Sequence, residues 1–270
     1  MFIDWIKFII LGIVQGITEI LPISSSGHLV LFQYLFNLKQ PGLAFEMFTN
    51  MASLVAMIVL FHKDIWHLIK QTFLFLFKKD QSAKHDFEYV LKLAIAVIPI
   101  GILGFILRDW VGSIKSLIFV GAALMLTGMF LLIIYRSRNQ SETHDEVSYK
   151  DALSIGLTQA IAIFPGVSRS GSTIIGGLTQ KLSLKALLKF SFLCYIIVSI
   201  PASLLSIYDL SQSTENIDLI GYLLAFITTL VVTYITGYFV MKRLQIKHLL
   251  YFGIYCLSVG FIAVLTHFFL

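Results

Sequence analysis

Two stretches of this chain are alike, and both are more polar than the apolar segments that contain them. The first reads GIVQGITEILPISSSGH over residues 12–28, and the second reads GLTQAIAIFPGVSRSGS over residues 156–172. Their alignment pairs Gly12 with Gly156, Gln15 with Gln159, Ser24 with Ser168, Ser26 with Ser170 and Gly27 with Gly171. Each stretch is an apolar half-helix that runs into a proline and then into a turn rich in serine and glycine.

Ionisable side chains stand within both stretches. Glu19 and His28 lie in the first and Arg169 lies in the second, each inside an apolar region. Ionisable groups at hydrophobic depth are costly and usually functional. The paired stretches therefore outline an active site, or a transport site, built from two related loops.

The composition places the chain in the membrane class. Hydrophobic residues make up 57% of it and charged residues only 13%, whereas a soluble domain of this size needs far more polar surface. The net charge of +5 fits a polytopic protein with Lys- and Arg-rich cytoplasmic loops. No basic stripe interleaved with aromatic residues stands outside the apolar segments, so we expect no nucleic-acid partner.

Hydropathy predicts both full spans and shorter broken segments. Stretches near the roughly 20 apolar residues that a spanning helix needs cover residues 43–61, 89–107, 117–135, 188–208, 219–240 and 249–268. Segments 2–21 and 152–164 are also apolar, but each breaks at a proline. These breaks favour re-entrant hairpins with second arms near residues 28–36 and 173–180, because irregular backbone at that depth must be buried in protein or line a wet cavity.

Basic residues predict the orientation. They concentrate in residues 63–84, 136–150, 181–189 and 242–247, which the positive-inside rule places in the cytoplasm. The C-terminus then ends outside, the first hairpin enters from outside and the second enters from the cytoplasm. Residues 62–88 mix aromatic residues with lysines, and we interpret them as an amphipathic interfacial stretch.

The expected fold is an all-α integral membrane protein with about six transmembrane helices plus two re-entrant helical hairpins arranged as inverted repeats. Residues 1–135 form the first repeat, residues 136–151 a cytoplasmic connector, and residues 152–270 the second repeat, all in a single membrane domain. Each repeat is one hairpin plus three spans, and this odd number inverts the second copy. Inverted repeats with broken helices that meet near the midplane are typical of transporters.

Gln15 and Glu19 share one helix face, because four residues separate them. A carboxylate at this position can act as a base, or it can hold a divalent cation against phosphate oxygens, as hard cations prefer. We therefore name Glu19 and Gln15 as candidate metal ligands. The alternative is that Glu19 only packs the helix, with hydrogen bonds to the serine turn that follows it.

The serine turn supplies further candidates. Backbone amides exposed at a turn where Gly27 frees the backbone form an anion-binding nest, so we expect Ser24, Ser26 and Gly27 to bind substrate. A hydroxyl such as that of Ser25 becomes a nucleophile beside a base, and His28 can act as base, nucleophile or leaving-group acid. Alternatively, some of these serines only satisfy backbone groups of the loop.

The second turn centres on Arg169. Small residues flank Arg169, so its guanidinium can approach an anion closely, and arginine is the usual bidentate clamp for phosphate. Ser168, Ser170 and Thr173 can add hydroxyl or amide donors, which makes them candidate substrate-binding residues. Glu46, near the start of the first span, is a second intramembrane acid that can face the same cavity.

The two motifs, Q-x3-E-x2-P-x-S-S-S-G-H over residues 15–28 and P-G-V-S-R-S-G-S-T over residues 165–173, resemble the signatures of the bacterial undecaprenyl-diphosphate phosphatase family, of the bacitracin-resistance BacA type. The resemblance continues through residues 190–193 and covers nearly the whole chain. Both motifs occur in the order that is typical of the family.

This resemblance implies a multi-pass phosphatase of the bacterial inner or plasma membrane whose active site faces the extracytoplasmic side. Its substrate would be undecaprenyl diphosphate, a polyprenyl diphosphate lipid, and its reaction would regenerate the carrier for peptidoglycan and other wall polymers and give bacitracin resistance. Glu19 with Gln15 matches the family's metal-binding and catalytic motif. Ser25 and His28 match the nucleophile or acid/base pair, and Arg169 matches the phosphate clamp. The family uses a divalent cation, Mg²⁺ or Ca²⁺, and the resemblance allows a homodimer within membrane lipid.

Departures from the family pattern and one alternative function accompany this resemblance. Gln15 replaces a glutamate of many members, and residues 49–53 and 180–181 differ from the usual pattern. An inverted-repeat protein with an anion site at the midplane can also carry a polyprenyl phosphate across the bilayer without chemistry. Glu19 and His28 favour hydrolysis, because a carrier of an anion gains little from a carboxylate beside it.

Overall fold

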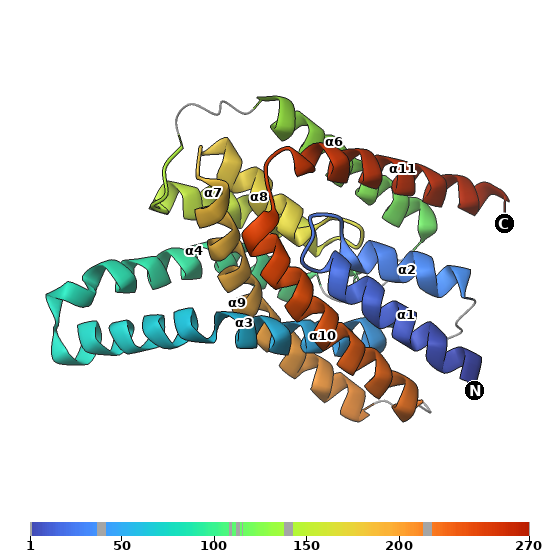
Figure 1. Cartoon of the computed structure of the whole chain (residues 1–270), viewed down its shortest axis with the longest axis horizontal. Coiled ribbons are helices and arrows are strands. Elements are labelled where there is room, and N and C mark those ends of the chain that lie inside the picture. Colours follow the sequence, from blue (N-terminus) through green and yellow to red (C-terminus); the bar gives the residue numbers. More distant parts are fainter. Residues whose placement is uncertain are drawn as a thin grey trace.

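The computed structural model describes residues 2–36, 42–107, 110–111, 114, 116–137, 143–212 and 218–269, and these ranges are mostly helical (Figure 1). In chain order the elements are α1 (Phe2–Thr18), α2 (Ser25–Leu35), α3 (Gly42–Lys78), η1 (Gln81–Ala83), α4 (Lys84–Ile106), α6 (Leu117–Ser137), α7 (Tyr149–Ala160), η2 (Ile161–Ile163), α8 (Arg169–Thr179), α9 (Leu184–Gln212), α10 (Leu219–Arg243) and α11 (His248–Phe269).

Helices long and apolar enough to cross a membrane occur six times in the described ranges, in Phe45–Lys78, Gln81–Ile106, Leu117–Ser137, Leu184–Leu205, Leu219–Arg243 and His248–His267. Each overlaps most of one of the spans that hydropathy predicts. The expected all-α, multi-pass membrane class is therefore confirmed, and the spans differ from the predictions mainly at their ends.

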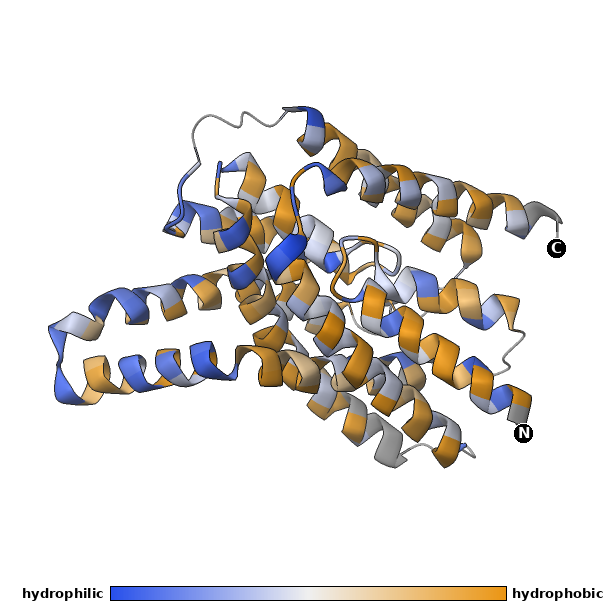
Figure 2. Cartoon of the chain, in the orientation of Figure 1, coloured by the Kyte–Doolittle hydropathy of each residue, from blue (hydrophilic) through white to orange (hydrophobic). Residues whose placement is uncertain are grey.

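The largest difference lies in α3. Its helix does not end at residue 61 but continues to Lys78, so most of the expected interfacial stretch is the end of α3, η1 and the start of α4. Hydropathy falls at Lys63 and Asp64, yet neither glycine nor proline interrupts residues 43–78, and a helix needs no apolar side chains once it leaves hydrocarbon. The α3–α4 hairpin projects away from the other helices, and its outer part carries a mixture of hydrophilic and hydrophobic residues (Figures 1 and 2).

Capping side chains explain why other helices begin earlier than expected. The second arms start at Ser25 and Arg169 because the side chains of Ser24 and Ser168 each accept a hydrogen bond from a backbone amide of the first turn. A capping box starts α7 at Tyr149, which lies inside the predicted connector of residues 136–151. Residues 138–142 of that connector lie outside the described residues.

Helices from distant parts of the sequence pack as pairs. The contacts of α1 with α10, α4 with α7, α3 with α9 and α6 with α11 hold the first and second halves of the chain together. Hydrogen bonds add to two of these pairs, since Gln159 Nε2 donates to the Ala96 carbonyl at 2.5 Å and Thr229 Oγ1 donates to the Gly12 carbonyl at 3.2 Å. Small and hydroxyl-bearing residues at helix interfaces are the expected means of association in a membrane.

Among the six long helices, α9 buries the largest share of its most apolar stretch, and α4 buries the smallest share. The α9 side chains that face the interior include Phe190 and Cys194, which belong to the main apolar core, and also the polar residues Ser191 and Ser199. Burial of this helix requires only apolar side chains. The buried hydroxyl groups of α9 therefore indicate that polar groups lie beside this helix.

The connector is tied to the turn between α8 and α9. The His144 amide donates to the Lys181 carbonyl at 3.1 Å, and the Ser183 amide donates to the His144 carbonyl at 2.9 Å. The His144 ring nitrogens lie 2.9 Å from the Glu146 carbonyl and 3.0 Å from the Gln180 carbonyl. Because carbonyl oxygens only accept hydrogen bonds, both contacts are satisfied at once only by the doubly protonated imidazolium.

Replacing Gly156 by alanine is expected to destabilise the fold, because a Cβ on Gly156 would lie 2.9 Å from the carbonyl oxygen of Ala96. Separating α7 from α4 to make room costs about 1–3 kcal/mol. Gly101→Ala is the matched control on α4, since a Cβ there would have no neighbour within 4 Å. The measurement is the melting temperature in detergent, and equal effects of the two substitutions would contradict this packing.

His144 is expected to make stability depend on pH. Burial lowers its pKa, but the carbonyls of Glu146 and Gln180 and the carboxylates of Asp151 and Asp145 outweigh burial and raise the pKa of the imidazole overall. A raised pKa in the folded state stabilises the fold below the ordinary pKa of about 6.5, and this contribution disappears as the pH rises through the folded value.

The test compares the melting temperatures of wild type and His144→Asn across this pH range. We expect their difference to be larger at pH 5.5 than at pH 8.5. A difference that stays constant, or grows toward high pH, would show that the ring does not hold the connector as an imidazolium.

Candidate active site

The two serine turns meet at the centre of the bundle. In both turns a serine caps a helix, since Ser24 Oγ accepts from the Gly27 amide at 3.4 Å and Ser168 Oγ accepts from the Gly171 amide at 3.0 Å. Each turn also binds the other, because Ser170 Oγ donates to the Leu21 carbonyl at 2.9 Å. The predicted pairing of the two stretches therefore corresponds to direct contact between them.

Gly27 has a different role from the one predicted for it. It lies inside α2, and the residue of this turn with left-handed backbone is Ser24, at φ 69°. Gly27 instead permits close packing, since a Cβ there would lie 3.2 Å from Gly166 Cα. The Gly27 amide is used in capping α2, and Gly27 is not among the residues that line the cavity described next.

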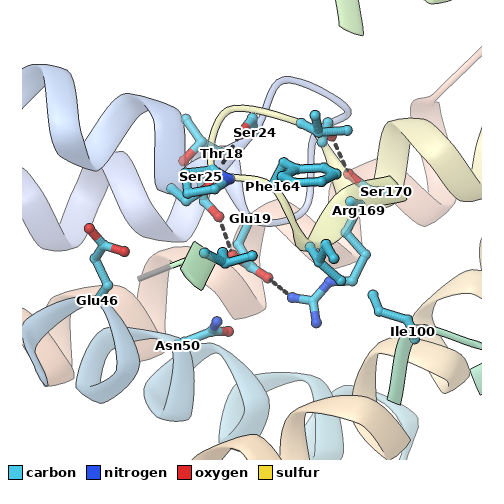
Figure 3. Close-up of a pocket in the computed structure, with 17 residues that line it drawn as sticks. Thr18, Glu19, Ser24, Ser25, Glu46, Asn50, Ile100, Phe164, Arg169 and Ser170 are labelled. Carbon is cyan, nitrogen blue, oxygen red and sulfur yellow. Dashed lines mark hydrogen bonds and ion pairs between the residues drawn. The ribbon is translucent and has the colours of Figure 1, made fainter. Parts of the chain in front are cut away.

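A cavity of about 250 Å³ lies where the turns meet (Figure 3). Its polar lining comes from both turns and from α3, and it comprises Thr18, Glu19, Ser24, Ser25, Ser26, Glu46, Asn50, Ser168, Arg169 and Ser170. Seven of the candidate residues from the two motifs are in this set. Glu46, which the sequence analysis named as an acid that can face the same cavity, also lines it. The structure thus gathers most of the predicted site in one place.

The Glu19 carboxylate organises this cavity. Arg169 Nη2 lies 2.5 Å from its Oε1, Gln15 Nε2 donates to its Oε2 at 3.0 Å, and Ser25 Oγ donates to the same Oε2. The Glu19 side chain is only 3% exposed, against 22% for Arg169, so the guanidinium is the more accessible partner. A hydroxyl that donates to a buried carboxylate has its proton acceptor in place, which is the geometry of an activated nucleophile.

Arg169 is held on its other sides by α9. Its guanidinium carbon lies 4.5 Å from the centroid of the Tyr195 ring, a cation–π contact, and Nη1 lies 3.4 Å from Ser199 Oγ. The Tyr195 hydroxyl donates to Asn50 Oδ1 at 3.0 Å. Sequence reasoning missed these three residues as parts of the site, although a polar residue one helical turn from Glu46 was a signal for Asn50.

His28 lies outside the polar cavity. Its Nδ1 is 2.7 Å from the Ser24 carbonyl oxygen and its Nε2 is 2.8 Å from the Tyr255 hydroxyl, and the two rings stack at 5.5 Å. It lines a separate and mainly apolar cavity of about 520 Å³ between α1, α2 and α11. His28 therefore supports the carbonyl of the residue before Ser25, and it is not among the side chains that surround Glu19.

Thr173 also stands apart from the cavity. It is buried, and its hydroxyl lies 2.9 Å from the Ser170 carbonyl oxygen and 2.5 Å from Ser191 Oγ. Thr173 thus connects α8 to α9. Of the predicted substrate-binding residues, Ser24, Ser26, Ser168 and Ser170 line the cavity. Gly27 and Thr173 do not line it.

The oxygen donors of the cavity determine what cation it can hold. Among the described residues, no group of three or more His, Cys, Asp or Glu side chains is arranged for a metal. Gln15 turns its amide nitrogen to Glu19, and its buried Oε1 has no hydrogen-bond partner. Glu19 and Glu46 are carboxylates on the cavity wall, and this set fits a hard cation that takes its remaining ligands from water and substrate phosphates.

Breaking the ion pair from one side is expected to destabilise the fold. Arg169→Met leaves the Glu19 carboxylate buried without its cation, which costs about 3–5 kcal/mol. Adding Glu19→Gln removes the unpaired charge and should restore much of the stability. The melting temperatures of the two single variants and the double variant form a double-mutant cycle, and additive losses would contradict a direct pair.

Comparison with known proteins places this architecture in a family. The family model for bacitracin resistance protein BacA matches residues 8–262. The undecaprenyl-diphosphatase of Acholeplasma laidlawii (strain PG-8A) is 40% identical over 271 residues, which cover 97% of each protein. Undecaprenyl-diphosphatase 2 of Bacillus thuringiensis (strain Al Hakam) is 41% identical over 94% of this chain and 95% of its own length. The chain belongs to the BacA family of bacitracin resistance proteins.

Proposed function

We propose that this membrane protein hydrolyses undecaprenyl diphosphate to undecaprenyl phosphate and inorganic phosphate, which recycles the lipid carrier for cell-wall synthesis and gives bacitracin resistance. Relatives named undecaprenyl-diphosphatase match it over nearly their whole length. The observation that carries the proposal is the cavity in which Glu19 accepts from Ser25 and pairs with Arg169. A nucleophile, its base and an anion clamp lie together among helices suited to a membrane.

The reaction follows from these three side chains. Ser25 Oγ attacks the terminal phosphorus, Glu19 takes the hydroxyl proton, and the bond to the bridging oxygen breaks, so that undecaprenyl phosphate leaves. Glu19 gives this proton to the oxygen of the departing undecaprenyl phosphate and is a carboxylate again. Water then attacks the phosphoserine while Glu19 takes one of its protons. The bond from phosphorus to Ser25 Oγ breaks, Ser25 Oγ takes the proton from Glu19, and inorganic phosphate leaves. Arg169 stabilises the charge on the transferred group. A Mg²⁺ or Ca²⁺ ion, when bound beside Glu19, would neutralise further charge on the diphosphate.

His28 then acts through position. It contacts the Ser24 carbonyl and the Tyr255 hydroxyl, and Ser24 is the strained residue directly before the nucleophile. We assign the attack to Ser25 and not to His28, since Ser25 is the one of the two that reaches Glu19. His28 keeps the turn in the conformation that presents Ser25.

The active site is proposed to face the extracytoplasmic side. Glu46 and Asn50 lie in the first turns of α3, and Ile100 lies toward the end of α4, so the cavity is near one end of both helices. The lysines of residues 63–84 lie at the other end, on the projecting hairpin. The positive-inside rule puts that hairpin in the cytoplasm and the cavity toward the outside.

The symmetry of the helix contacts supports inverted repeats. The two halves have corresponding helices in the same order, α1, α2, α3, α4 and α6 in the first half and α7, α8, α9, α10 and α11 in the second. When each helix is exchanged with its counterpart, the contact of α1 with α10 becomes the contact of α7 with α4. The pairs α3–α9 and α6–α11 stay the same. Gly12 packs on Ala225 as Gly156 packs on Ala96. We propose that α1–α2 and α7–α8 are the two re-entrant hairpins, which enter from opposite faces.

Glu19→Gln and Ser25→Ala are expected to lower phosphate release from undecaprenyl diphosphate by about 100-fold or more, because each removes a partner of the proton transfer. The assay uses purified protein in detergent, with and without EDTA to test the cation. Glu88→Gln, on the cytoplasmic part of α4, is the matched control. If the variants keep wild-type turnover, the proposed roles are wrong; if wild type binds the lipid without hydrolysing it, the alternative of a polyprenyl-phosphate transporter is favoured.

A further inference from the structure

Tyr195 touches two side chains of the cavity that come from different halves of the chain. The face of its ring lies against the Arg169 guanidinium at 4.5 Å. Its hydroxyl donates to Asn50 Oδ1 at 3.0 Å and lies 3.3 Å from the Asn50 backbone carbonyl oxygen. Tyr195 is itself buried, so both contacts are made away from solvent.

The contact with Tyr195 fixes the orientation of the Asn50 amide. Because Asn50 Oδ1 accepts from the tyrosine hydroxyl, the amide nitrogen points away from that hydroxyl. Asn50 also lines the cavity beside Glu19 and Arg169 (Figure 3). Its two N–H donors are therefore available to a molecule in the cavity.

A neutral donor suits this cavity for an electrostatic reason. Two carboxylates, Glu19 and Glu46, line the same wall as one guanidinium, Arg169. A diphosphate brings further negative charge to these carboxylates, so every donor that faces it contributes to binding. An amide donates hydrogen bonds and needs no counterion of its own when the cavity is empty of substrate.

We propose that Asn50 is a substrate-binding residue that donates to non-bridging oxygens of the diphosphate, and that Tyr195 is the positioning residue that orients both Asn50 and Arg169. This inference rests on the proposed function for the identity of the anion. It adds α3 and α9 to a site that the two serine turns alone do not complete. The substrate thereby accepts hydrogen bonds from donors on three separate elements.

Asn50→Asp gives the sharpest test, because aspartate has nearly the same shape and still accepts from Tyr195. It loses only the N–H donors and places a negative charge toward the diphosphate. We expect KM for undecaprenyl diphosphate to rise by about tenfold or more, as for a lost hydrogen bond to a charged group. Asn50→Ala should raise KM by a similar factor, and kcat should change much less in both.

Tyr195→Phe separates the two contacts of the tyrosine. It keeps the ring against Arg169 but frees the Asn50 amide to rotate, so its KM should rise as in Asn50→Ala, and combining the two substitutions should add little. Tyr195→Leu also removes the ring and should lower kcat as well. Tyr234→Phe, on an exposed position of α10, is the matched control and should behave as wild type.

Binding of inorganic pyrophosphate, followed by calorimetry, distinguishes this inference from the proposed function. Weaker binding by Asn50→Asp than by wild type, at an unchanged melting temperature, supports the inference even if turnover were absent. Wild-type KM and pyrophosphate affinity in Asn50→Asp would overturn it while hydrolysis stood. Additive effects of Asn50→Ala and Tyr195→Phe would show that the tyrosine hydroxyl does not act through the amide.

Discussion

The ion pair between Glu19 and Arg169 is the interaction on which the centre of this molecule depends. It joins residues 150 positions apart, at 2.5 Å, with the carboxylate almost fully buried. A buried ion pair adds little stability relative to apolar residues of the same volume, because desolvation consumes most of the attraction. Its neighbours Gln15, Ser25 and Tyr195 complete the hydrogen bonding and stacking around it. Such an arrangement is better explained by the chemistry of a charged substrate than by folding alone.

The same requirement shapes the backbone of the two turns. At hydrophobic depth an irregular turn must find partners for its amides and carbonyls within the protein. The turns find some of them in each other, through Ser170 and the Leu21 carbonyl, and others in α6, where Thr127 Oγ1 accepts from the Ser168 amide at 3.2 Å. Each turn thus forms part of the protein surroundings that bury the other. The cavity lies between these two turns, and residues of both line it.

Much of this was predictable from the sequence, and the exceptions have physical reasons. Hydropathy located the six long helices, but it misplaced the end of α3, because a helix continues past hydrocarbon wherever no residue stops it. The alignment of the two stretches anticipated that Ser25, Glu19 and Arg169 would meet. It did not anticipate that His28 turns toward α11, since α2 has a cavity on each side and spacing does not say which one a side chain enters. A single residue within a span, such as Tyr195, carries no local signal of a partner far away in sequence.

The long separation between Glu19 and Arg169 also bears on how the protein is made. Residues enter a membrane in the order of their synthesis, so Glu19 reaches hydrophobic depth well before Arg169 exists. A carboxyl group at that depth without a cationic partner is costly to bury. The guanidinium that pairs with Glu19 is supplied only when α8 arrives. A chain interrupted before Arg169 would contain one member of the ion pair without the other, so the proposed site is assembled only in the finished protein.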